Sequence, residues 1–287
     1  RNEWQARYLN ISGTLNINTQ TAYLMALHYN LLTDDNAIDK TRTALKNNIR
    51  NNGNKLTTGF LGTAILNQTL SEQGLNDEAY TLLLQRDCPS WLYSIDQGAT
   101  TVWERWNSYT VKDGFGDPGM NSFNHYAYGA VAEWMFRHMA GIGPDENNVG
   151  FRHIILAPNP DTRTTIPNRQ ERITNVTASF WSNYGHITAE WDCDGNAEMT
   201  YNVTIPPNTT ATLLMPCAEG YEVYENGVIA SEAEGVEHVG YADGRAIYNL
   251  GSGSYMFATA PSLGISDIPS PAEDDRCYNI LGMPLNS

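Results

Sequence analysis

The segment around Glu104 contains the residue types that carbohydrate chemistry needs. Glu104 lies between Trp103 and Trp106, in a stretch entered through Gly98 and several small residues. An aromatic face can stack on the C–H face of a pyranose, and a nearby carboxylate can accept a proton from water. The pattern is therefore consistent with a sugar site. The alternative is that both tryptophans are core anchors and that Glu104 pairs with Arg105 or another cation.

A second group of polar and aromatic residues precedes the last helical segment of the first half. His125 lies there between Asn124 and Tyr126. Its imidazole could hydrogen-bond a hydroxyl-rich ligand or cap the turn. Asp113 and Asp117 lie in a glycine-containing stretch but lack the ligand spacing of an EF-hand.

The sequence lacks the common motifs for cofactor binding and nucleophilic catalysis. The sequence has no GxSxG, P-loop, HExxH or strand-following GxGxxG motif, which argues against nucleotide-binding, metalloprotease and nucleophile-elbow chemistry. We expect no metal and no cofactor.

The elements that position these residues are helical in the first half of the chain. Apolar residues recur with helical spacing, for example at Ala22, Met25, Ala26 and Tyr29 behind a cap at Asn18 or Thr19. Further helices are predicted at 35–50, 60–70 (capped by Thr57 or Thr58), from 76 to Cys88-Pro89, and at 122–139 with Gly141 as the C-terminal cap. Short connections predict stacked helical hairpins, and residues 98–120 are predicted to form a long functional loop.

The second half of the chain has the two-residue period of strands. Alternation is clear at Val176/Ala178/Phe180, at Ile187/Ala189/Trp191 and from Met199 to Ile205. Asn226-Gly227 is a strong hairpin signal. Many short strands with Gly, Pro and Asn between them predict an antiparallel β-sandwich.

Charge and hydropathy exclude several classes of partner. The 287 residues have a net charge of −15, which disfavours nucleic acid and anionic lipid. No apolar run approaches the roughly 20 residues of a membrane helix. We therefore expect no nucleic-acid partner and no membrane insertion.

Taken in order, four motifs resemble bacterial α-L-rhamnosidases, glycoside hydrolase family 78. They are LTTGF at 56–60, GATTVWERW at 98–106, NHYAYGAV at 124–131 and GFRHIILAP at 150–158. The resemblance implies part of a six-hairpin α/α barrel at 1–143, an antiparallel β-sandwich at 144–262, and a linker or tail at 263–287.

The resemblance also implies roles for individual residues. By position in the motifs, Glu104 is the general base of an inverting hydrolysis, and His125 contacts the bound sugar. Trp103 and Trp106 flank the base as candidate substrate-binding residues, and the resemblance does not assign which of them contacts the sugar. The implied substrate is a carbohydrate with a terminal α-L-rhamnose.

One departure from the family's pattern matters for activity. The family's general acid and several acidic sugar-binding residues lie in the first half of the barrel, and this chain begins after that region. We expect the chain to be the C-terminal fragment of the enzyme and inactive alone, because inverting hydrolysis needs two carboxyl groups. We also expect homo-oligomers through the truncated face, because a cut barrel would expose apolar helix surface.

Two alternatives and one expectation about location remain open. The chain could belong to another α/α-barrel glycosidase, or be a carbohydrate-binding or structural module without catalysis. Residues 274–283 resemble the start of a short C-terminal β module of secreted Bacteroidetes proteins. A periplasmic, cell-surface or secreted location is therefore expected.

Overall fold

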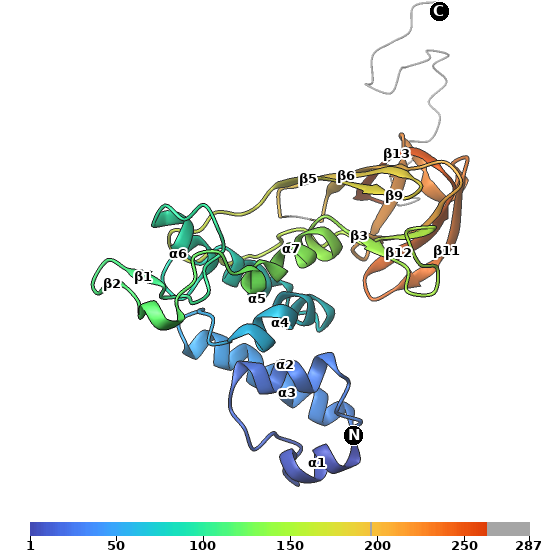
Figure 1. The fold of residues 1–287 in the computed structure, drawn as a ribbon. Coiled ribbons are helices and arrows are strands. Elements are labelled where there is room, and N and C mark those ends of the chain that lie inside the picture. Colours follow the sequence, from blue (N-terminus) through green and yellow to red (C-terminus); the bar gives the residue numbers. More distant parts are fainter. Residues whose placement is uncertain (196, 263–287) are drawn as a thin grey trace, which may run out of the picture.

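A computed structural model describes residues 1–195 and 197–262, which form a helical part followed by a β-sandwich (Figure 1). The α-helices are α1 (Asn2–Tyr8), α2 (Gln20–His28), α3 (Asp35–Asn51), α4 (Phe60–Glu72), α5 (Asn76–Leu83), α6 (Trp91–Asp96) and α7 (Val131–Trp134). Shorter helical turns are η1 (Pro118–Met120), η2 (Tyr126–Ala130), the π-helical η3 (Met135–Met139) and η4 (Ala230–Glu232). The predicted order, helices and then strands, is confirmed.

The helical part is a stack in which α4 packs against α2, α5 and α7 (Figure 1). The predicted helices at 35–50 and 60–70 are present. Thr19 caps α2 as predicted, with its side chain accepting from Ala22 N at 3.2 Å. The prediction that Thr57 or Thr58 caps α4 is wrong. The cap position is Gly59, and Thr58 is buried with its hydroxyl 2.8 Å from the Thr63 hydroxyl.

Three other helix predictions need correction. In α2 the buried apolar residues are Tyr23, Leu24, Ala26 and Leu27, whereas the predicted Met25 and Tyr29 are exposed. The helix is apolar on several sides, so periodicity alone fitted two faces. The helix from Asn76 ends at Leu83 rather than near Cys88, and the sequence did not predict α6.

The predicted helix at 122–139 begins only at Tyr126. Residues 122–125 instead form an irregular segment that backbone hydrogen bonds hold against residues 102–104. The C-terminal end of this helical segment is as predicted. Gly141 has φ +82°, and a Cβ there would lie 2.4 Å from Pro158 N, so only glycine fits.

The second part is a sandwich of a six-stranded and a five-stranded sheet. The sheet orders are β10-β9-β13-β7-β6-β5 and β11-β12-β8-β4-β3, and every pairing is antiparallel except β4 with β8. The strands are β3 (Ile142–Pro144), β4 (His153–Leu156), β5 (Asn175–Ser182), β6 (Gly185–Cys193), β7 (Met199–Ile205), β8 (Thr210–Pro216), β9 (Tyr221–Glu225), β10 (Val228–Ile229), β11 (Val236–Ala242), β12 (Arg245–Leu250) and β13 (Gly253–Pro261). The predicted Asn226-Gly227 turn joins β9 to β10, with both residues at positive φ.

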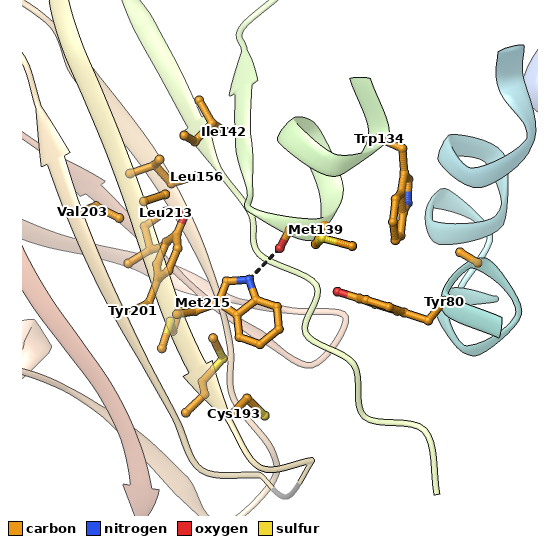
Figure 2. Close-up of a cluster of buried hydrophobic side chains, with 14 of the residues drawn as sticks. Tyr80, Trp134, Met139, Ile142, Leu156, Cys193, Tyr201, Val203, Leu213 and Met215 are labelled. Carbon is orange, nitrogen blue, oxygen red and sulfur yellow. Dashed lines mark hydrogen bonds between the residues drawn. The ribbon is translucent and has the colours of Figure 1, made fainter. Parts of the chain in front are cut away.

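The two parts share one hydrophobic core. The Trp191 indole of β6 donates to Met139 O at 2.7 Å, the dashed line in Figure 2. Tyr80 of α5 and Trp134 of α7 pack edge to face beside it (Figure 2). A continuous core of this kind holds the loops of the helical part at a fixed position relative to the sandwich.

The predicted boundary at 143/144 falls inside β3, which pairs with β4. The predicted tail at 263–287, with its resemblance at 274–283, lies outside the described residues. Among the described residues, no helix has the length and apolarity that crossing a bilayer requires.

Candidate active site

Glu104 lies where two loop segments run side by side. Its backbone N–H donates to Ser122 O at 2.9 Å, and Ser122 N donates to the Glu104 carboxylate Oε2 at 2.7 Å. A second backbone hydrogen bond joins the same two segments: His125 N donates to Val102 O at 2.8 Å. The structure therefore brings the segments that carry Glu104 and His125 together, and it orients the carboxylate with a main-chain donor.

Glu104 is a half-buried residue whose carboxylate accepts a hydrogen bond from a backbone amide. Within residues 1–195 and 197–262, no Lys, Arg or His forms an ion pair with Glu104. The alternative that Glu104 pairs with Arg105 is therefore not realised. Arg105 instead extends along a cavity wall, and its backbone N–H donates to Ser108 Oγ at 3.1 Å.

The sequence motifs at 56–60, 98–106 and 124–131 meet at this place. The Trp106 indole donates to Thr58 O at 3.0 Å, and its ring stacks on Tyr128 at a centroid distance of 3.8 Å. Phe60, the first residue of α4, stacks on His125 at 4.7 Å with an interplanar angle of 13°. Aromatic contacts thus tie the helix α4 to the segments that carry Trp106 and His125.

The imidazole of His125 is held by ring stacking rather than by a hydrogen bond to the described residues. It occupies the position before η2, but its side chain makes no capping hydrogen bond, so the capping interpretation is wrong. Its Nδ1 is buried and has no hydrogen-bond partner among the described residues. A buried, unpaired ring nitrogen is costly unless a ligand or water completes it.

Trp103 and Trp106 are both packed and both line a cavity. Trp103 is buried and forms a T-shaped pair with Phe123, and Trp106 contacts both Trp91 and Tyr128. A cavity of about 310 Å³ reaches both indoles, and a second of about 620 Å³ reaches Trp103. Glu104 is not among the residues that line either cavity. A role for either tryptophan in binding substrate stays a prediction.

The β1 (Tyr109–Thr110) and β2 (Gly114–Phe115) hairpin extends from the same loop. Its acidic residues serve the turns: Asp113 Oδ2 contacts the Thr110 hydroxyl at 3.3 Å, and Asp117 Oδ1 accepts from Gly119 N at 2.9 Å. Among the described residues, no group of three or more His, Cys, Asp or Glu side chains could hold a metal ion.

Three further residues contribute to the site but were not predicted from the sequence. Ser122 acts through its backbone amide, which no sequence pattern identifies. Phe60 and Tyr128 lie inside the quoted motifs, but their rings matter only because folding stacks them on His125 and Trp106. Burial is the main factor that raises the pKa of Tyr128, with Arg105 lowering it and Glu104 raising it further.

Comparisons with known proteins agree with this architecture. Residues 1–139 match the six-hairpin glycosidase domain of bacterial α-L-rhamnosidases, and residues 141–230 match the C-terminal domain of bacterial α-L-rhamnosidases. Fold and site thus define the later part of a six-hairpin glycosidase domain joined to its β-sandwich.

Individual relatives give the identification. An α-L-rhamnosidase of Formosa agariphila is 42% identical over 198 residues, which are 69% of this chain and 20% of that protein. One of Streptomyces avermitilis is 37% identical over 258 residues, 90% of this chain and 23% of that protein. The crystal structure of Streptomyces avermitilis α-L-rhamnosidase complexed with L-rhamnose superposes with a TM-score of 0.76 at 36% identity, over 90% of this chain and 23% of that one. The chain belongs to the bacterial α-L-rhamnosidases as a C-terminal portion, and it spans about a fifth of the length of these relatives.

Proposed function

We propose that this chain supplies the general base, Glu104, of an inverting glycoside hydrolase that releases terminal α-L-rhamnose. The observation that carries the proposal is the Glu104 carboxylate itself, oriented by the Ser122 amide and paired with no cation among the described residues. Such a carboxylate keeps lone pairs available for a water molecule. The relatives, all α-L-rhamnosidases by name, support rhamnose as the sugar.

In the proposed reaction Glu104 takes one proton from water while the water oxygen attacks the anomeric carbon. The glycosidic C–O bond breaks with the development of oxocarbenium character, and a carboxylic acid on the opposite face protonates the departing oxygen. The two carboxyl groups of an inverting enzyme are roughly 6.5–9.5 Å apart. We place the acid outside this chain, which spans a fifth of its relatives.

His125 is proposed to contact the sugar through Nδ1, which is buried and has no hydrogen-bond partner within residues 1–195 and 197–262. A hydroxyl placed there would satisfy the nitrogen, and the Phe60 ring holds the imidazole so that little entropy is lost on binding. Trp103 and Trp106 are proposed to contact the substrate where they line the cavities.

The test compares this chain with a full-length enzyme that carries it, using an aryl α-L-rhamnoside. We expect no appreciable turnover by the chain alone. In the full-length enzyme, Glu104→Gln should lower kcat about 10²- to 10⁴-fold with little change in KM, whereas His125→Ala should chiefly raise KM. Robust turnover by the chain alone would refute the external acid, and a loss of only a few-fold in Glu104→Gln would refute the base.

A homo-oligomer through an uncovered helical face is also proposed, supported by exposed apolar side chains on α2 and α4. For the parent protein we propose a periplasmic, cell-surface or secreted location, which rests on the resemblance at 274–283 alone. Fractionation of the producing cells would test it, and recovery in the cytoplasm would refute it.

A further inference from the structure

The outer face of the six-stranded sheet holds a largely exposed indole near the tip of the β5–β6 hairpin. Trp181 is 75% exposed and pairs across the strands with His186. Its ring stacks on the imidazole at a centroid distance of 4.5 Å and an interplanar angle of 21°. Because His186 supports one face of the indole, the ring has a defined orientation and its other face is available to solvent.

A row of hydroxyl side chains crosses four strands beside this stacked pair. Ser179 of β5 pairs with Thr188 of β6, Thr188 with Thr204 of β7, and Thr204 with Ser254 of β13. Directly opposed residues of antiparallel strands share a face, and Ser179 precedes Trp181 by two residues, so the row lies on the face of the indole. At roughly 4.8 Å per strand the row extends about 15 Å, a length that matches a short oligosaccharide.

The charge of this sheet is entirely negative or neutral. Strands β5, β6, β7, β9, β10 and β13 contain no lysine or arginine. Their acidic residues include Glu190, which pairs with Asn202 in the row next to the hydroxyls. Carboxylate and amide oxygens accept bonds from sugar hydroxyls, whereas a uronate or sulfated chain would be repelled.

We propose that this face is an accessory binding site for a neutral glycan, with one sugar ring stacked on Trp181 and its neighbours hydrogen-bonded along the Ser179–Ser254 row. The negative face of the indole attracts the polarised C–H bonds of a pyranose, and the hydroxyl row supplies both donors and acceptors. The site is separate from the Glu104 loop and does not depend on a catalytic role for Glu104. Its effect would be to hold the enzyme on a polymeric substrate.

The experiment is a binding titration of the 287-residue chain with a neutral arabinogalactan, a neutral mannan and anionic polygalacturonate. We expect at least one neutral glycan to bind and polygalacturonate not to bind. Trp181→Ala should weaken binding about tenfold, the scale of one lost aromatic contact with its buried area, and Trp181→Phe should retain most of it. Val239→Ala, which removes apolar surface that is 56% exposed on β11 of the other sheet, is the matched control and should bind normally.

A Glu104→Gln variant separates this site from the proposed active site and should bind the neutral glycan unchanged. The proposal is overturned if neither neutral glycan binds, if Trp181→Ala binds as tightly as the unmodified chain, or if polygalacturonate is preferred. Loss of binding in Glu104→Gln but not in Trp181→Ala would assign the signal to the loop of the helical part. The rhamnoside assay of the full-length enzyme reports independently on the catalytic proposal.

Discussion

A main-chain donor holds the Glu104 carboxylate, and this has consequences for how the residue can work. A side-chain donor can rotate away or titrate, but the Ser122 amide is fixed by the reciprocal bond from Glu104 N to Ser122 O. The pair of bonds determines the direction of Oε2, while Oε1 accepts no hydrogen bond from the described residues. Preorganisation of this kind reduces the reorganisation that a proton transfer requires.

At the residue scale, His138 predicts an acid-sensitive fold. Burial, followed by Arg137 and Arg245, lowers the pKa of His138 from 6.5 to about 4, and Glu133 opposes this weakly. Between pH 6.5 and 4 the unfolded chain therefore binds the additional proton. The contribution of His138 to the free energy of unfolding should be greatest above pH 6.5. It should fall by about 3 kcal/mol as the pH drops from 6.5 to 4. Urea unfolding at a series of pH values measures this slope.

The comparison variants are His138→Gln, which should flatten the slope, and His238→Gln at an exposed position, which should not. Glu72 lies 3.9 Å from His138, and burial raises the pKa of its carboxyl. Its protonation favours the folded state as the pH falls, so it opposes the His138 effect. Equal slopes in the unmodified chain and His138→Gln would contradict the assignment.

What the sequence revealed at this scale depended on side-chain chemistry. Glu104 and His125 were singled out as a carboxylate and an imidazole beside aromatic residues, but their roles came from the resemblance to the α-L-rhamnosidase motifs and stay predictions. The Ser122 amide could not be found, since every residue except proline has one. The choice between a capping and a free imidazole at His125 also depended on where η2 begins, which backbone pairing with residues 102–104 determines.

At the scale of elements, a buried ion pair anchors the segment that leads from β4 to β5. Arg163 Nε and one terminal nitrogen each donate to Asp161 at 2.8 Å, and both side chains are essentially fully buried. Asp161 also accepts from Ile173 N at 3.1 Å, and Arg163 reaches the Thr81 hydroxyl of α5 at 3.4 Å. The pair thus joins the connecting segment to the helical part.

Removing one partner of this pair should destabilise the chain strongly. Asp161→Asn leaves the guanidinium buried without its counter-ion, which costs about 3–5 kcal/mol of unfolding free energy. The control is Asp87→Asn, which breaks the exposed Asp87–Arg169 ion pair of the same chemistry and should cost less than about 1 kcal/mol. Denaturant unfolding monitored by circular dichroism gives both values. Similar losses in the two variants would show that burial does not set the strength of the Asp161 pair.

Element boundaries were predictable only where local signals agreed with packing. The strands β6 and β7 alternate strictly and are buried as their patterns indicate. In α2, by contrast, the sequence is apolar on several sides, and the contacts with α3 and α4 select the face with Tyr23, Leu24 and Leu27. A periodic pattern indicates that a helix has an apolar face, but it does not show which elements pack against that face.

At the scale of the whole molecule, the helical part is an open stack rather than a closed ring (Figure 1). Apolar side chains are exposed on α2, α4, α7 and η3. We name as the open helical face the exposed residues Met25, Tyr29, Leu61, Ala64, Ala132 and Phe136. Glu72 approaches His28 of α2 and His138 of η3, both at 3.9 Å, which places α2, α4 and the last helical segment around one side of the stack.

The open helical face should drive self-association of the isolated chain, because exposed apolar side chains are unfavourable in water. Leu61, which is 78% exposed, lies on the central helix α4 of this face. Leu61→Glu should therefore shift the chain toward monomer, as measured by light scattering coupled to size-exclusion chromatography across a range of concentrations. Val239→Glu adds the same charge on β11 of the sandwich and should leave the association unchanged. Since neither residue is buried, both variants should keep the fold, and a chain that remains monomeric at every concentration would show that the open helical face is not an interface.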